Sequence, residues 1–232
     1  MVHTPRTLPP PPQLVKYKQK WTARFQAALD AGSQSDWATA HAKRVLRTSL
    51  RGLAHGKCVY CESALEVTGY LEIDHYVAKT ATELAFEWTN LLPACQRCNN
   101  AKGHQDHKSA LLKPDYEDPE PYFWIHPDTG RLEPHPKLDE AQSYRATETI
   151  RICDLQRPAL CTKRVDMLTR VLAWLRPRAA WQGPLPYQTA SEWSTLSDPR
   201  TEYKLVLRHA LELHGQHALA EYDRRRFKGE VS

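Results

Sequence analysis

Cys58-Val-Tyr-Cys61 and Cys95-Gln-Arg-Cys98 are two Cys-x-x-Cys pairs, and Ile73-Asp-His75 and Trp88-Thr-Asn90 lie between them. Four thiolates in such pairs suit tetrahedral zinc, and a site closed by four thiolates has no open position for a substrate. Residues 62–94 separate the pairs, whereas a compact zinc ribbon has roughly 15 to 20 residues there. The sequence therefore predicts a structural zinc site with a second function inserted between its halves. Buried or disulfide-bonded cysteines are the alternative, which fits poorly because we see no signal peptide.

Asp74, His75 and Asn99 have the chemistry needed to hydrolyse a phosphodiester bond. The reaction needs an activated water, a charge to stabilise the transition state and help for the leaving oxygen, and one divalent ion supplies the last two. The Asp74 carboxylate and the Asn99 amide oxygen suit Mg²⁺, although Mn²⁺ or Ni²⁺ takes the same oxygens. His75 is expected to point to the opposite side of the strand from Asp74 and to act as the general base.

These residues resemble the HNH endonuclease family and its ββα-metal motif over roughly residues 55–105. The resemblance implies that Asp74 is a metal ligand and His75 the general base on the first strand. It also implies that Asn90 fixes the connecting loop, that Asn99 binds the metal from the helix, and that Lys102 meets a phosphate. Nothing in these positions separates DNA from RNA as the substrate.

A narrower resemblance extends to the stand-alone HNH effectors of Septu and retron anti-phage defence systems, of the PtuB type. It implies an ABC- or AAA-type ATPase partner, as in Septu systems. The chain has no Gly-x-x-x-x-Gly-Lys-Ser/Thr loop, so any ATP use is expected to lie in that partner. One departure is Ala78, at a position where HNH proteins often have proline, so the loop after His75 is expected to differ. The segments that carry the resemblance are 58–62, 86–92, 98–103, 112–115, 145–150 and 155–160.

Length and charge limit the remaining possibilities. At 232 residues the chain is long enough for one compact unit with appendages and too short for two large domains. No run approaches the roughly 18 apolar residues of a membrane span, and we expect a cytoplasmic protein. A formal net charge of +5 is compatible with a nucleic-acid partner without requiring one.

The N-terminal part is expected to contain an arm and two helices. Residues 1–12 form a proline-rich arm that we expect to be exposed, and residues 13–54 form a helical region. The first helix is predicted over 13–29 and ends before Gly32, and Asp36 is the predicted cap of the second. The apolar residues at helical spacing are Trp21, Phe25 and Leu29 in the first helix, and Trp37, Val45, Leu46 and Leu50 in the second.

Basic side chains lie on another face of the second predicted helix and continue toward the first cysteine pair. Their position just before the catalytic module favours contact with nucleic-acid phosphates, and a solvated helix face is the alternative. Together with Lys102, the predicted contacts are Lys43, Arg44, Arg47, Arg51 and Lys57.

Residues 55–112 are expected to form the nuclease core. A strand over 70–75, a return near residues 91 and 92 and a helix starting near Cys98 make its hairpin and helix. His104 and His107 follow this helix, either as polar loop residues or as contacts to metal or phosphate.

The C-terminal half is expected to be a hairpin followed by helices. Residues 113–137 are rich in proline and acid, and a hairpin around Gly130 is predicted to pack against the nuclease core. Residues 138–232 are predicted to be helical, with helices over 141–153, 159–175 and 202–220. Cys153 and Cys161 are interpreted as core cysteines, His209, His214 and His217 as a polar helix face, and Arg224–Arg226 as either a contact surface or a charged tail.

The sequence thus predicts a mostly helical α+β protein in which N- and C-terminal helices wrap a small zinc-clipped ββα-metal core. Its expected function is that of a metal-dependent HNH endonuclease that cuts DNA or RNA. The alternative is a catalytically silent, zinc-stabilised subunit that binds nucleic acid or a protein partner.

Overall fold

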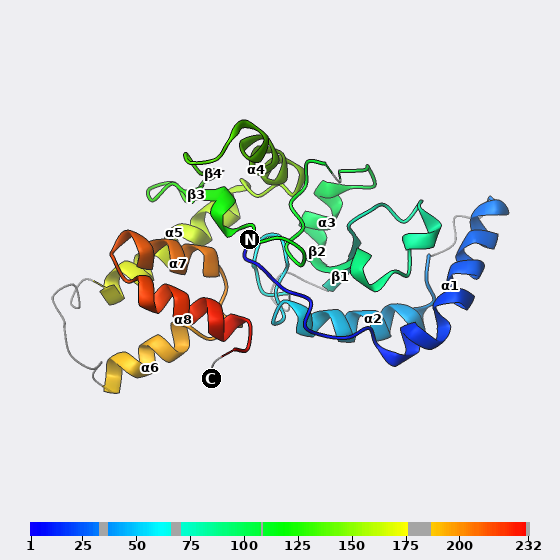
Figure 1. Ribbon diagram of the computed structural model, residues 1–232, viewed down its shortest axis with the longest axis horizontal. Helices are drawn as coiled ribbons and strands as arrows, with labels where there is room; N and C mark the ends of the chain where they lie inside the picture. Colours follow the sequence, from blue (N-terminus) through cyan, green and yellow to red (C-terminus); the bar gives the residue numbers. More distant parts are fainter. Residues whose placement is uncertain (33–36, 66–70, 108, 176–186, 231–232) are drawn as a thin grey trace.

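The protein is known from a computed structural model that describes residues 1–32, 37–65, 71–107, 109–175 and 187–230. Figure 1 shows a small hairpin and helix between α1 and α2 on one side and the C-terminal helices on the other. This arrangement confirms the predicted mostly helical α+β class. The helices and strands are α1 Pro12–Asp30, α2 Ala40–Leu53, β1 Leu71–His75, β2 Leu91–Cys95, α3 Gln96–Lys102, β3 Phe123–Ile125, β4 Leu132–Pro134, α4 Glu140–Ile152, α5 Pro158–Leu175, α6 Tyr187–Leu196, α7 Lys204–Leu213 and α8 His217–Phe227.

The central element is the antiparallel pair of β1 and β2. Leu71 lies opposite Cys95 and His75 opposite Leu91, and α3 follows β2 directly. Leu46 and Leu50 of α2 are fully buried, and α2 packs across both strands. The predicted hairpin and helix are therefore confirmed, with the helix starting two residues earlier than expected.

The two N-terminal helices largely follow the prediction. Pro12 occupies the first turn of α1, where its missing N–H costs no hydrogen bond, and Gly32 beyond the helix end has a left-handed φ of 64°. Phe25 is buried, but Leu29 is 41 % exposed because the last turn of α1 extends past the core. Thr39 caps α2 by accepting a hydrogen bond from Ala42 N, and the predicted cap Asp36 lies outside the described residues.

The prediction of an exposed N-terminal arm is wrong for its first residues. Met1, Val2 and Thr4 are buried, and the Thr4 amide donates to the Pro114 carbonyl at 2.8 Å. Arg6 is also bound to the rest of the protein, because its guanidinium forms an ion pair with Asp115, which follows α3 in the chain. Apolar side chains and backbone hydrogen bonds thus hold the start of the arm in the protein, and exposure is confined to residues 7–10 and 12.

The second hairpin, β3 and β4, forms where it was predicted. Its main neighbours are α4 and α7 rather than β1 and β2, although Phe123, Ile125 and Leu132 belong to the same buried cluster as Leu111 and Leu112 of the predicted nuclease core. Gly130 in its turn has φ of 65°, and a Cβ there would lie 2.1 Å from the Cys161 carbonyl oxygen of α5. The close approach to α5 therefore requires glycine.

The C-terminal helices confirm two predictions and correct one. α4 and α5 lie within one residue of the predicted ranges, but the helix expected over 202–220 is two helices, α7 and α8. The helical path is interrupted at Gly215, which lies between α7 and α8 and has a left-handed φ of 70°. No described helix is both long enough and apolar enough to cross a bilayer.

Candidate active site

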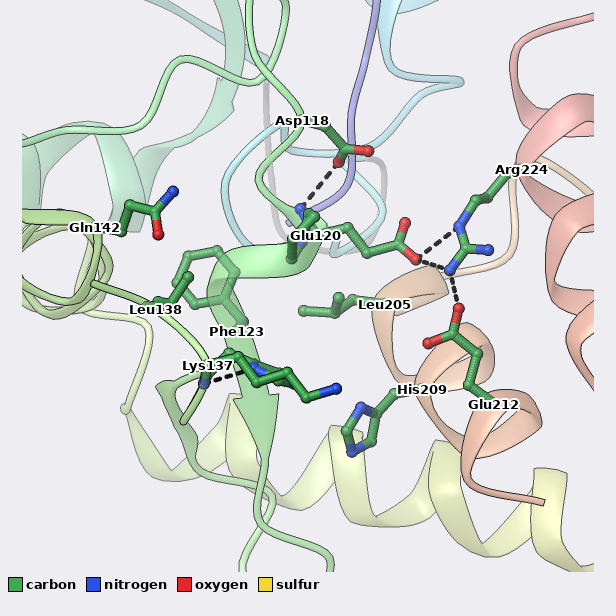
Figure 2. Close-up of a pocket in the computed structure, with 12 residues that line it drawn as sticks. Asp118, Glu120, Phe123, Lys137, Leu138, Gln142, Leu205, His209, Glu212 and Arg224 are labelled. Atoms are coloured by element: carbon green, nitrogen blue, oxygen red, sulfur yellow. Dashed lines mark hydrogen bonds and ion pairs between the residues drawn. The ribbon is translucent and has the colours of Figure 1, made fainter. Parts of the chain in front are cut away.

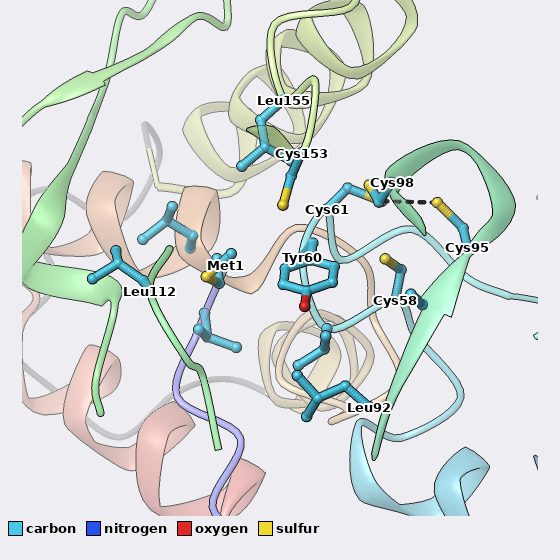
Figure 3. Packing of buried hydrophobic residues seen from close by; sticks show 14 of the residues in the cluster. Met1, Cys58, Tyr60, Cys61, Leu92, Cys95, Cys98, Leu112, Cys153 and Leu155 are labelled. Atoms are coloured by element: carbon cyan, nitrogen blue, oxygen red, sulfur yellow. Dashed lines mark hydrogen bonds between the residues drawn. The ribbon is translucent and has the colours of Figure 1, made fainter. Parts of the chain in front are cut away.

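The four cysteines of the two pairs converge on one point. Their sulfur atoms all lie within 4.8 Å of one another, and all four side chains are buried (Figure 3). None of the six cysteines forms a disulfide bond, so the disulfide alternative is wrong. Four sulfur donors at this separation suit the tetrahedral coordination of zinc, and the residues therefore fit that ion. Cys153 is buried and Cys161 half-buried, both outside this cluster, as core cysteines would be.

Arg157 lies against the cysteine cluster, which sequence reasoning missed. Its guanidinium nitrogens are 3.6 Å from Cys98 Sγ and 3.9 Å from Cys95 Sγ. A cation beside thiolates offsets part of their negative charge. The residue belongs to the turn between α4 and α5, and no spacing rule links that turn to the cysteines.

The Asp74 carboxylate is 1 % exposed and is held on both of its oxygens. The Tyr60 hydroxyl donates to Oδ2 at 2.5 Å, and Lys102 Nζ donates to Oδ1 at 3.0 Å. Lys102 Nζ also donates to the His75 carbonyl at 2.6 Å, and Lys102 is only 3 % exposed. The expected contact of Lys102 with a phosphate is therefore wrong for this structure, because the ammonium is buried and hydrogen-bonded to groups of the protein.

His75 has the geometry of a neutral base. Its Nε2 lies 2.9 Å from the Ala85 carbonyl oxygen, which only accepts, so the proton sits on Nε2 and Nδ1 keeps its lone pair. Burial lowers the pKa of His75 to about 4. The edge of the Trp37 ring contacts the imidazole, with ring centroids 4.5 Å apart. His75 is therefore uncharged at neutral pH and fixed in one tautomer.

Asn90 fixes the loop between the strands. Its Oδ1 accepts from the Val77 amide at 2.7 Å, and its Nδ2 donates to the carbonyls of Val77 and Leu84, both at 3.0 Å. Leu84 immediately precedes Ala85, so these bonds also place the carbonyl that orients His75. Asn90 therefore supports the loop backbone, and it does not line the cavity that contains Asp74 and His75.

Asp74, His75 and Asn99 line one cavity of about 230 Å³ beside α2 and α3. Glu72 joins them, and sequence reasoning missed it although it lies two residues before Asp74 on the same face of β1. The two carboxylates and the Asn99 amide are hard oxygen donors, and a carboxylate oxygen with one hydrogen bond keeps a free lone pair. These residues fit a hard divalent cation. His104 lines the cavity as well, whereas His107 turns back to the Lys102 carbonyl.

The predicted basic contacts fall into two groups. Lys43 lines the cavity, and Arg44 and Arg51 are exposed on the same helix. Arg47 donates from Nε to the Leu71 carbonyl at 2.9 Å, so this side chain is partly committed to β1. The prediction that Lys57 contacts nucleic acid is wrong. The residue is 2 % exposed, its ammonium donates to two backbone carbonyls, and burial lowers its pKa to about 7.

Arg224 and Arg226 are also structural, which corrects the view of these two residues as a contact surface or tail, whereas Arg225 between them is exposed. Arg224 pairs with Glu120 and Glu212, and Arg226 Nη1 donates to Ser197 Oγ at 2.5 Å. His209 is half-buried against Trp124, with ring centroids 4.4 Å apart, so it is not part of a solvated polar face.

A larger cavity of about 470 Å³ lies between the second hairpin and α7, away from these residues (Figure 2). Its charged groups largely satisfy one another, since Glu120 accepts from Arg208 and Arg224. None of the predicted site residues lines it. Size alone therefore does not identify the reactive site of this protein.

Comparison with known proteins gives the class of this module. Residues 58–105 match the HNH endonuclease family, described as "HNH endonuclease". The chain is also similar to two relatives that both carry the name Septu protein PtuB. The one from Bacillus thuringiensis is 35 % identical over 122 residues, which cover 51 % of this chain and 44 % of the relative.

The second relative, from Bacillus mycoides (strain KBAB4), is 29 % identical over 154 residues, or 53 % of this chain and 50 % of that protein. The resemblance predicted from the motif is therefore confirmed. The chain spans about half the length of the curated relatives that it matches.

Proposed function

We propose that this protein is a metal-dependent endonuclease that hydrolyses nucleic-acid phosphodiester bonds, with His75 as the general base. The observation that carries this proposal is the hydrogen bond from His75 Nε2 to the Ala85 carbonyl, which leaves the Nδ1 lone pair for a water. Nδ1 takes a proton from the water, whose oxygen forms a bond to phosphorus while the bond from phosphorus to the leaving ester oxygen breaks. The leaving oxygen receives a proton from solvent.

Asp74 and Asn99 are the proposed ligands of a catalytic Mg²⁺, and Glu72 adds a third oxygen donor on the same cavity. When bound, the ion supplies positive charge to the transition state and to the leaving oxygen. The residues of this chain supply the orientation. Asp74 is held by Tyr60 and Lys102, and Asn90 holds the loop that places the His75 partner. The proposed role of Cys58, Cys61, Cys95 and Cys98 is a structural zinc site.

The proposed substrate surface runs from the cavity along α2. Lys43 and Lys79 line the cavity, and Arg44, Arg47 and Arg51 continue the positive charge along the helix. Such a row suits a polyanionic backbone, because phosphate contacts dominate affinity for nucleic acids. Lys57 and Lys102 do not belong to this surface.

The similarity to the Septu proteins supports a role in anti-phage defence, as in Septu or retron systems. From the same similarity we infer that the nuclease works with an ATPase partner. The chain has no Gly-x-x-x-x-Gly-Lys-Ser/Thr loop, so any ATP use belongs to that partner. The second candidate is a silent binding subunit, which the intact set of Asp74, His75 and Asn99 disfavours.

The test is cleavage of plasmid DNA and of total tRNA with Mg²⁺, with Mn²⁺ and with EDTA. Wild type is compared with His75→Ala and with His214→Ala, an exposed histidine at the end of α7 that serves as the control. Metal-dependent cutting that is lost in His75→Ala alone supports the proposal and identifies the substrate. Cutting by His75→Ala at the wild-type rate would remove His75 as the base. If no substrate is cut even with the ATPase partner present, the binding-subunit alternative holds.

A further inference from the structure

A buried tyrosine connects the first cysteine pair to the proposed catalytic carboxylate. Tyr60 lies between Cys58 and Cys61, is completely buried, and donates its hydroxyl to Asp74 Oδ2 at 2.5 Å. The loop that carries it is fixed to β2, since the Val59 amide donates to the Pro93 carbonyl at 2.9 Å. Figure 3 shows the Tyr60 ring among the buried side chains, next to Cys58 and Leu92.

The second cysteine pair reaches the same carboxylate from its other side. Cys98 and Lys102 lie one turn apart on α3, and Lys102 Nζ donates to Asp74 Oδ1 at 3.0 Å. One oxygen of the Asp74 carboxylate is therefore held from the loop of the first cysteine pair, and the other from the helix that contains Cys98 of the second pair. These bonds satisfy both oxygens of a carboxylate that is almost completely buried.

We propose that Tyr60 is a positioning residue for Asp74, through which the cysteine cluster orients the metal-binding carboxylate. This inference rests on the proposed function, because it takes Asp74 as a metal ligand. The carboxylate is 1 % exposed, so water does not replace a lost partner easily. Two donors on opposite oxygens fix the rotation of the carboxylate plane, and Asp74 lines the same cavity as Asn99.

The expected size of the effect follows from the general role of such partners. Removing a group that hydrogen-bonds to a metal ligand typically costs about 10- to 100-fold in metal affinity or activity. Tyr60→Phe keeps the ring in the core and removes only the hydroxyl. We expect this variant to bind the divalent ion about 10- to 100-fold more weakly, to keep its zinc, and to recover most of its cleavage rate at saturating Mg²⁺.

The matched control is Tyr203→Phe. Tyr203 is also buried beside the first pair, and its hydroxyl hydrogen-bonds to Ser63 Oγ at 2.9 Å and not to a carboxylate. Removing this hydroxyl reproduces the general cost of losing a buried hydrogen bond near the cluster. We expect the control to bind the divalent ion as wild type does.

The experiment is a Mn²⁺ titration of the full, zinc-loaded chain without nucleic acid, followed by electron paramagnetic resonance, with zinc content measured in parallel. A weaker Mn²⁺ affinity in Tyr60→Phe than in wild type and Tyr203→Phe, with one zinc per chain in all three, supports the inference. Equal affinity in all three proteins overturns it, and so does loss of zinc from Tyr60→Phe, since the effect would then run through the fold.

Failure of the proposed function has a different signature. If wild type binds Mn²⁺ at a site that Asn99→Ala weakens but cuts no nucleic acid, the nuclease assignment fails while the role of Tyr60 still follows from the titration. If Asn99→Ala leaves the Mn²⁺ affinity unchanged, the proposed metal site is wrong and the inference about Tyr60 falls with it.

Discussion

Asn90→Ala should destabilise the protein and impair cleavage through the loop that it holds. The Asn90 side chain is buried and makes three hydrogen bonds to backbone groups of Val77 and Leu84. A typical intramolecular hydrogen bond contributes about 0.5–1.5 kcal/mol net, so the loss of three lowers the free energy of unfolding by about 3 kcal/mol. The effect is local, because all three partners lie within residues 77–84.

The consequence for the site runs through one carbonyl. Ala85 follows Leu84, and its oxygen fixes the proton of His75 on Nε2. A displacement of about 1 Å in a reacting group costs roughly 10²-fold in rate, so we expect cleavage by Asn90→Ala to fall by about that factor. The Michaelis constant for the nucleic acid should change little, because Asn90 is buried and does not line the cavity that contains His75.

The assay is urea unfolding of the zinc-loaded protein followed by tryptophan fluorescence, together with hydrogen exchange at the Val77 amide. Asn100→Ala is the control, since Asn100 is exposed on α3. Faster exchange at Val77 with a loss of about 3 kcal/mol is the expected result. Unchanged protection of Val77, or a stability equal to that of the control, would refute the reasoning.

Four further outcomes are expected. The pKa of His75 is lowered to about 4, so the base stays unprotonated as pH falls from 6.5 toward 4, and the pH profile of kcat/KM should keep its activity through that range. In the unfolded chain the His75 imidazole takes up its proton near pH 6.5. Thermal unfolding should therefore show that stability decreases as the pH is lowered from 6.5 to 4. Cys95→Ser should lose zinc and much of its helical circular dichroism, because metal binding is coupled to folding. The pKa of Lys57 is lowered to about 7, so the unfolded chain binds more protons between pH 7 and 10.5; wild type should gain stability relative to Lys57→Met as pH rises through that range.

The sequence predicted the parts of the protein that depend on short-range spacing. The cysteine pairs, the hairpin of β1 and β2 and the helix after it follow from Cys-x-x-Cys spacing, alternation and helical periodicity. The start of α5 at Pro158 follows from the position of that proline for the same reason. These signals lie within a few residues of the structure that they predict.

Partners distant in the sequence were not predictable from such signals. Lys102 appeared to be a phosphate contact from its place in the motif, but its partner Asp74 lies 28 residues earlier. Lys57 appeared to extend the basic row of α2, but its acceptors Pro199 and Thr201 lie more than 140 residues later. A lysine has the same letter whether its ammonium is solvated or buried, and only the tertiary structure decides between them.

The same distinction limits what net charge says about nucleic-acid binding. Three lysines are buried, and the ammonium of each donates to a carboxylate or a backbone carbonyl inside the protein: Lys57, Lys102 and Lys204. These cations count toward the formal charge of +5 but cannot meet a phosphate without leaving their partners. The positive charge available to a polyanion therefore has to be judged side chain by side chain. Exposure on α2 motivates the proposed substrate surface there, since Arg44 is exposed and Lys43 of the same helix lines the cavity that His75 also lines.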